Sequence, residues 1–295
     1  MGRDDAGLCL SSGLEISSGV ASARIALRGA ELKSWRVGGL ELIWPGDEKY
    51  WADSAPILFP VVGWTRDGVS VEGRRYPLGL HGFARGEEFS LIEQTADRVL
   101  LRLRANERTS TLYPFAFRID VEYLLYNNVL KIILHVMNEG GAAMPFACGL
   151  HPGFNWPLPG ASGEHFLRFD AEERAEVPII APGGLFSTRR RPIPLRGREL
   201  MLTPDLFEEA LCFLDANSAG LEFAAAGGSS LRMELENFPH IALWSLSGAP
   251  FLCLEAWTGH GDPENFAGDL FAKPSMRILA PGESARSAAS FLWRP

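Results

Sequence analysis

The chain has 295 residues, of which 46% are hydrophobic and 22% are charged, and its 36 Asp and Glu against 28 Lys and Arg give a net charge of −8. This composition is typical of a globular protein with a substantial core, and it argues against intrinsic disorder. A negative net charge repels a phosphate backbone, so we expect no nucleic-acid partner.

The N-terminal residues and the cysteines bear on the cellular compartment of the protein. Arg3, Asp4 and Asp5 are not followed by an apolar stretch of signal-peptide length, and no apolar run reaches 18 residues. We therefore expect a cytoplasmic protein with no membrane partner. Free thiols in a reducing compartment are favoured over disulfides or metal ligands, because no CxxC spacing occurs among the four cysteines. They are Cys9, Cys148, Cys212 and Cys253.

In chain order, the first strong signals are a strand at 99–104 and a hairpin after it. In 117–123 apolar residues alternate with charged ones, which places one face of a strand in a core. Asn127 and Asn128 tolerate the positive φ values of a tight turn, and a second alternating run follows at 130–136. These residues predict a β-hairpin.

The second half of the chain mixes weak and strong strand signals. We expect 154–194 to form loops and short edge strands, and the arginine run 189–191, broken by Pro192, to be a solvated loop and not a phosphate site. Strands are predicted again at 231–236 and 241–246.

A short helix is predicted only at 204–210, with Thr203 as its cap and Pro204 in its first turn. Such sparse helical signals exclude a doubly wound α/β fold. No repeat or linker divides the chain, and 31 Gly and 20 Pro punctuate its short strands. We therefore expect a single all-β domain over residues 1–295, a large β-sandwich with few short helices.

Three segments depart from the alternating pattern by placing ionisable groups among aromatics and glycines. In the first, His81 precedes Gly82, which permits a close backbone approach, and Arg85 adds a fork of donors suited to hydroxyl or carboxylate oxygens. Taken alone, this histidine is more readily explained by a structural role.

The second segment offers a histidine and flat rings. His151 precedes Pro152, which keeps its backbone extended, and Phe154 and Trp156 offer faces on which a sugar can stack. A structural and a functional role are equally compatible with this segment.

The third segment, 251–257, ends an apolar strand with Glu255 beside Trp257. A buried carboxylate is costly without a partner or a purpose, although a glutamate at a strand end can also turn outward.

The three segments in this order resemble the aldose 1-epimerase (galactose mutarotase-like) family, and in particular its LacX-like branch. The similarity covers most of the chain, and no single motif is long. It includes 56–60 (PILFP), the HGFAR core at 81–85, 149–155 (GLHPGFN), 238–239 (FP) with 243–245 (LWS), and 251–257 (FLCLEAW).

The resemblance implies a β-supersandwich with a concave sugar-binding sheet and a mutarotase activity that interconverts α and β anomers. It implies His151 as general acid, Glu255 as general base and His81 as a second histidine that binds the sugar. Arg85 lies in the same motif and is expected to support the substrate or His81. The other residues expected to contact the sugar are Asn155, Phe154, Trp257 and Asp205.

Two departures from the family pattern bear on the choice of sugar. Relatives carry a Gly-Arg or Asn-Arg pair where this chain has Gly63 and Trp64, and a proline where it has Ala256. The aspartate that some members use to hold hydroxyls is assigned to Asp205, with two alternatives of lower rank, Asp215 and Asp262.

The chemistry explains why these residue types suffice. Opening a hemiacetal requires a base at O1 and an acid at the ring oxygen; a glutamate is ionised at neutral pH, and a carboxylate nearby would raise the histidine pKa modestly. No cofactor or metal is expected.

Three alternatives remain open. The first is a non-catalytic carbohydrate-binding or regulatory module on the same scaffold. The second is a metal site built from His81, His151 and Glu255. The third is glycoside cleavage, for which only Glu255 stands out. The identity of the sugar, including whether it is a hexose or a hexose phosphate, and the oligomeric state are left undetermined.

Overall fold

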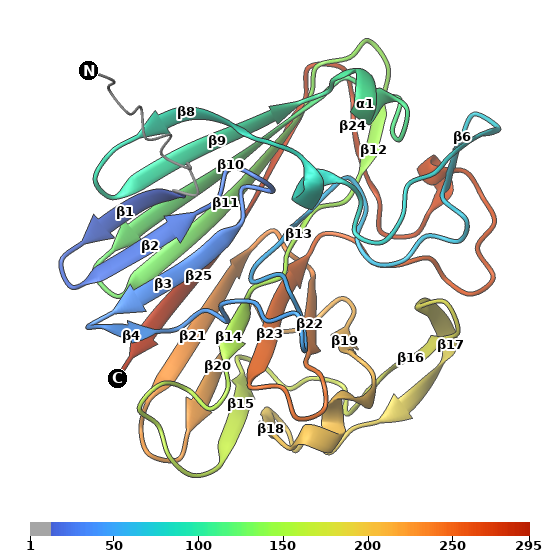
Figure 1. Ribbon diagram of the computed structural model, residues 1–295. Coiled ribbons are helices and arrows are strands. Elements are labelled where there is room, and N and C mark those ends of the chain that lie inside the picture. The colour runs from blue at the N-terminus through green and yellow to red at the C-terminus, as the bar shows by residue number, and fades with distance from the viewer. Residues whose placement is uncertain (1–12) are drawn as a thin grey trace, which may run out of the picture.

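The computed structural model describes residues 13–295, so Cys9 and the charges at the N-terminus lie outside the described residues. Strands dominate this part of the chain (Figure 1). Within residues 13–295 no helix is long and apolar enough to cross a membrane. The helices are η1 (Ala84–Gly86), α1 (Glu107–Ser110), η2 (Pro204–Glu208) and η3 (Leu270–Ala272).

The largest sheet has nine antiparallel strands in the order β18-β15-β20-β21-β25-β11-β10-β9-β8. They are β8 (Ser90–Gln94), β9 (Arg98–Arg104), β10 (Phe117–Tyr126), β11 (Val129–Asn138), β15 (His165–Phe169), β18 (Glu199–Met201), β20 (Gly220–Ala225), β21 (Ser230–Glu236) and β25 (Ser284–Arg294).

The second sheet has six strands, in the order β19-β22-β23-β13-β5, with β14 also paired to β23. They are β5 (Ile57–Leu58), β13 (Gly149–Leu150), β14 (Gly153–Asn155), β19 (Leu211–Phe213), β22 (His240–Trp244) and β23 (Phe251–Trp257).

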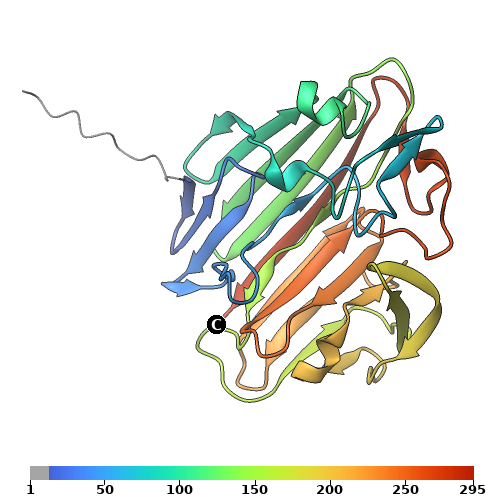
Figure 2. The same cartoon turned by 45° about the vertical axis from the view of Figure 1, so that its right-hand side comes forward.

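Smaller sheets complete the fold. A four-stranded sheet lies against β9 and β10 of the nine-stranded sheet (Figure 1), and a hairpin of β16 and β17 stands at one edge of the molecule (Figures 1 and 2). Their strands are β1 (Leu14–Ser18), β2 (Ala21–Ile25), β3 (Leu32–Val37), β4 (Leu40–Glu41), β6 (Val69–Val71), β7 (Arg74–Tyr76), β12 (Met144–Phe146), β16 (Glu176–Ala181), β17 (Leu185–Pro192) and β24 (Arg277–Leu279).

The predicted hairpin is confirmed as β10 and β11, and the turn between them places Asn127 at a φ of 49°. The apolar residues of the alternating pattern are buried, as the period predicts. Asp120, on the opposite face, is buried as well, because Arg102 on the neighbouring β9 binds both of its carboxylate oxygens at 2.6 and 2.8 Å.

Two expectations for the second half of the chain were wrong. The arginine run 189–191 forms part of strand β17 and not a loop, because β16 pairs with it and Glu176 binds Arg190 at 2.9 Å. Strand β15 lies inside the nine-stranded sheet, between β18 and β20, and is not an edge strand. The predicted helix exists only as the 3₁₀ turn η2, and the Thr203 side chain accepts no capping hydrogen bond from its backbone N–H groups.

The nine- and six-stranded sheets pack face to face through aromatic side chains. Phe154 of β14 contacts Phe291 of β25 with ring centroids 5.2 Å apart, and Phe213 of β19 contacts Phe169 of β15 at 4.8 Å. One face of the six-stranded sheet is thereby buried in the main core, and its opposite face is left for the site described below.

We predict that Phe154→Ala lowers the free energy of unfolding by about 3–5 kcal/mol, because it leaves a cavity between the two sheets. Urea denaturation of the two proteins measures this difference. A change below about 1 kcal/mol would show that Phe154 does not serve this packing role.

Candidate active site

A cavity of about 540 Å³ lies on the open face of the six-stranded sheet. This volume is within the range typical of small-molecule sites, about 300–1,000 Å³. Five of the residues singled out from the sequence line it: His81, Arg85, His151, Glu255 and Trp257. The described chain thus brings together groups from three segments far apart in sequence.

Strand register explains why His151 and Glu255 meet. In β23 the side chains of Leu252, Leu254 and Ala256 belong to the main core, so Glu255 points to the opposite face. Leu150 of β13 pairs with Ala256 and shares its core face. His151, one residue further, therefore emerges on the cavity face, across from Glu255.

Glu255 is held by two contacts to one oxygen. His151 Nε2 lies 3.2 Å from Oε2, and the indole nitrogen of Trp257 donates to the same oxygen at 3.0 Å. Within residues 13–295, no donor bonds to the second oxygen, Oε1. The carboxyl group is thus oriented by its neighbours and keeps one oxygen for a ligand hydroxyl.

Burial sets the protonation of this pair. The side chain of Glu255 is 2% exposed, and its burial raises the pKa of the carboxyl well above 4.5. Burial lowers the pKa of His151 to about 3, and the charge of Arg85 acts in the same direction. The expectation that a carboxylate raises the histidine pKa was therefore wrong, because burial dominates the pKa of His151 and also favours the uncharged form of Glu255.

His81 is fixed as a neutral hydrogen-bond donor. The backbone N–H of Gly63 donates to His81 Nδ1 at 3.1 Å, which leaves the ring proton on Nε2. Burial, with the neighbouring His151 and Arg85, lowers the pKa of His81 well below 6.5. The backbone of His81 has a φ of 62°. The next residue must be glycine, because a Cβ on Gly82 would lie 2.2 Å from the Phe59 carbonyl oxygen.

Indole rings enclose His151. The ring centroid of Trp51 lies 5.1 Å from that of His151, and the centroid of Trp244 lies 5.7 Å from it. Both tryptophans line the cavity. They shield the imidazole from water, which accounts for the lowered pKa, and they add apolar faces for a sugar.

Trp64 and the β16–β17 hairpin form the outer wall of the cavity. The Trp64 side chain is 45% exposed, and its indole lies so close to Gly184, between the two strands, that a Cβ there would be 1.8 Å from the ring. Ile180 and Phe186 of the same hairpin also line the cavity. Trp64, at the position where the family resemblance led us to expect arginine, thus contributes an aromatic side chain to this wall.

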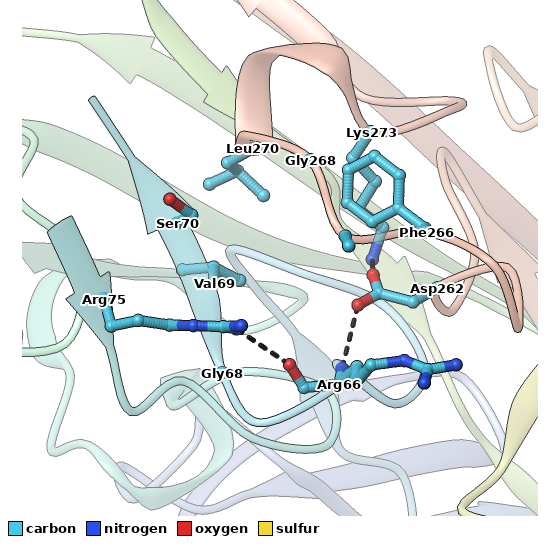
Figure 3. Close-up of a pocket in the computed structure, with 11 residues that line it drawn as sticks. Arg66, Gly68, Val69, Ser70, Arg75, Asp262, Phe266, Gly268, Leu270 and Lys273 are labelled. Carbon is cyan, nitrogen blue, oxygen red and sulfur yellow. Dashed lines mark hydrogen bonds and ion pairs between the residues drawn. The ribbon is translucent and has the colours of Figure 1, made fainter. Parts of the chain in front are cut away.

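Asp262 does not line this cavity. It lies in a separate, smaller pocket, between Arg66 and Lys273 (Figure 3). Its carboxylate accepts from the backbone N–H of Arg66 at 2.8 Å and pairs with the buried Lys273 at 2.9 Å. Its backbone N–H donates to the Trp64 carbonyl oxygen and its own carbonyl oxygen accepts from Phe186. Asp262 therefore ties together the segments that carry the wall.

Three residues expected to contact the sugar do not line the cavity: Phe154, Asn155 and Asp205. Phe154 pairs with Leu252 and shares its core face. The Asn155 amide donates to the Glu41 carbonyl oxygen at 2.9 Å. Asp205 lies in η2, two residues before the buried Phe207. Glu208 and Glu209, which follow Phe207, line the cavity in place of Asp205.

Several residues of the cavity were missed from the sequence. They come from loops, from η2 and from the strands β19 and β22, whose cavity-facing sides could not be identified from alternation. The sequence contains eight tryptophans, but nothing in it indicated which of them line the cavity. The missed residues are Trp51, Asp53, Glu208, Glu209, Cys212 and Trp244.

The three candidates for a metal site are close together, but they do not form one. Within residues 13–295, no group of three or more His, Cys, Asp or Glu side chains is arranged to hold a metal ion. His81 has Nδ1 occupied by a backbone N–H, and His151 directs Nε2 at Glu255.

We predict that Glu255→Gln stabilises the protein at neutral pH. Because burial raises the Glu255 pKa, the folded state keeps a proton that the unfolded state loses above pH 4.5, so stability falls as the pH rises above that value. Removing the group should raise the melting temperature by a few degrees near pH 7 and by little near pH 4. A difference that does not change between pH 4 and pH 8 would contradict this.

The chain resembles known proteins over most of its length. The chain is 30% identical over 293 residues to the chromosomal protein LacX of Lactococcus lactis subsp. lactis, covering 93% of this chain and 97% of that protein. A galactose mutarotase-like protein from Lactobacillus casei superposes with a TM-score of 0.89 at 27% identity, covering 96% of this chain and 100% of that one.

A more distant likeness, of the fold alone, extends to the galactose 1-epimerase of Lactobacillus acidophilus. Its TM-score is 0.71 at 14% identity, and the match covers 94% of this chain and 92% of that one. The model of the Aldose 1-epimerase family matches residues 13–291. The chain therefore belongs to the aldose 1-epimerase family.

Proposed function

We propose that this protein is a mutarotase that interconverts the α and β anomers of a hexose or related sugar by opening and closing its ring. The observation that carries the proposal is the buried contact of 3.2 Å between His151 Nε2 and Glu255 Oε2 on the floor of a sugar-sized cavity. A pure binding site needs aromatic faces and hydrogen bonds, but it does not need a buried acid and base in contact.

The protonation of the pair fits this reaction. Burial favours the uncharged forms, in which one proton is shared by Glu255 and His151. Transfer of that proton across the contact creates a carboxylate and an imidazolium without changing the net charge. The carboxylate then takes the O1 proton of the sugar while the imidazolium protonates its ring oxygen.

Ring closure reverses these steps after rotation about the C1–C2 bond. The Glu255 carboxyl returns its proton to O1, and the His151 imidazole takes one from the C5 hydroxyl. His81 donates its Nε2 proton to a sugar oxygen, because Nδ1 is occupied by the Gly63 N–H. Trp51 and Trp244 exclude water from the reacting atoms.

We predict that His151→Ala and Glu255→Gln each lower the rate of anomer exchange by about 10²–10⁴-fold, because each removes one half of the proton transfer. NMR magnetisation transfer on a panel of free hexoses measures the exchange rate. Cys253→Ala is a matched control, since it changes a buried β23 residue that does not line the cavity.

Acceleration by wild-type protein that survives a chelator and is lost in both variants would support the mutarotase. Sugars that shift protein resonances without any faster exchange would contradict it and identify a carbohydrate-binding module. A requirement for stoichiometric metal would favour the metalloenzyme alternative.

The charges of the cavity favour a free sugar over a sugar phosphate. Asp53, Glu208 and Glu209 line it, and Arg85 is its single lining cation among the described residues. None of the arginines 189–191 lines the cavity; Arg191 lies 3.4 Å from the Glu209 carboxylate. The basic run is thus not directed at a bound phosphate.

We predict that kcat/KM for a hexose 6-phosphate is at least about tenfold below that for the free hexose, because the lining carboxylates repel the phosphate. Polarimetry or NMR exchange on both sugars at equal ionic strength measures the ratio. Equal values, or a preference for the phosphate, would contradict the free-sugar assignment.

The proposal includes a cytoplasmic location. It is supported by the thiols of Cys148, Cys212 and Cys253, which are free and buried and which a reducing compartment preserves.

A further inference from the structure

Asp53 and Arg85 face each other across the cavity lining without forming a hydrogen bond. Arg85 Nη1 and Asp53 Oδ2 are 3.6 Å apart, and the side chains are 36% and 41% exposed. Elsewhere in the fold arginine and aspartate close on each other: Arg102 binds both oxygens of Asp120 at 2.6 and 2.8 Å. The pair at the cavity therefore keeps free donors and free acceptor positions.

The backbone holds this open arrangement in place. The Glu31 carboxylate accepts from the N–H groups of Ser54 and Ala55 at 2.6 and 3.0 Å, which fixes the chain next to Asp53. On the other side Arg85 lies in η1, and the N–H of Ala84 donates to the Phe59 carbonyl oxygen at 3.2 Å. Neither group depends on the other for its position, so a ligand that enters between them meets two preset partners.

The pair lies within the electrostatic reach of the reacting groups. The charge of Arg85 lowers the pKa of both His81 and His151. Asp53 follows Trp51, whose ring contacts His151. A sugar ring held at His151 and Glu255 therefore presents its remaining hydroxyls near these two side chains.

We propose that Asp53 and Arg85 bind two neighbouring hydroxyls of the sugar ring, and that Asp53 is a specificity-determining residue of the site. A hydroxyl both donates and accepts, so one hydroxyl of a vicinal diol donates to the carboxylate while the next accepts from the guanidinium. A sugar that lacks either hydroxyl leaves a charged group without its partner. The proposal rests on the mutarotase function proposed above.

The test compares the free hexose that wild-type protein turns over fastest with its monodeoxy derivatives, in wild type, Asp53→Ala and Asp53→Asn. Asp53→Ala is expected to lower kcat/KM on the parent sugar by about 10- to 100-fold, since a hydrogen bond to a charged group is lost. Asp53→Asn should recover part of this loss, because its amide oxygen still accepts.

The decisive measurement is how the effect of Asp53→Ala on kcat/KM changes from one deoxy sugar to another. For the one deoxy derivative that lacks the hydroxyl bound by Asp53, wild type and Asp53→Ala should differ by less than about twofold. A control is Asp170→Ala, which removes an aspartate paired with Arg232 away from the cavity. It is expected to leave kcat/KM unchanged for every sugar.

Two outcomes would overturn the inference: no loss on the parent sugar, or an equal loss on all deoxy derivatives, which would indicate a structural effect of Asp53. If wild-type protein accelerates no sugar, the proposed function fails instead. The same comparison is then made on dissociation constants from tryptophan fluorescence, where an Asp53→Ala effect that disappears for one deoxy sugar supports hydroxyl binding and a uniform effect refutes it.

Discussion

The site depends on one constraint, which is that a carboxyl and an imidazole lie in contact in a place that water barely reaches. Glu255 and His151 are 1% and 8% exposed. Such burial penalises both charged forms, which raises one pKa and lowers the other. These opposite shifts favour the uncharged forms of both groups, and the mechanism proposed above uses the one proton that the uncharged pair holds.

The β-sandwich supplies the rigidity that this contact needs. Adjacent strands fix the spacing of His151 and Glu255, and the main core on the opposite face of the six-stranded sheet prevents the strands from shifting. The indole N–H of Trp257 orients the carboxyl group. Glu255 lies in β23 and His151 directly follows β13, so both side chains are held more firmly than side chains on long loops.

Loops and the small hairpin serve a different purpose. Trp64, the β16–β17 hairpin and Asp53 line the cavity, and in the mechanism proposed above they shape the space for the sugar while His151 and Glu255 move the protons. The backbone hydrogen bonds of Asp262 to Trp64 and Phe186 show that this outer wall is also held in a fixed position.

Local alternation in the sequence determined the hairpin of β10 and β11, because one buried and one solvated face leave a period of two. The motifs around His81, His151 and Glu255 likewise identified the family, and these three residues meet at the cavity. Only the tertiary structure decided which side of β14 and β23 faces the cavity, since apolar residues occupy both sides. Phe154 was therefore misassigned, and Asp53 and Trp51 were missed, because loops bring them to the site by contacts that no local pattern encodes.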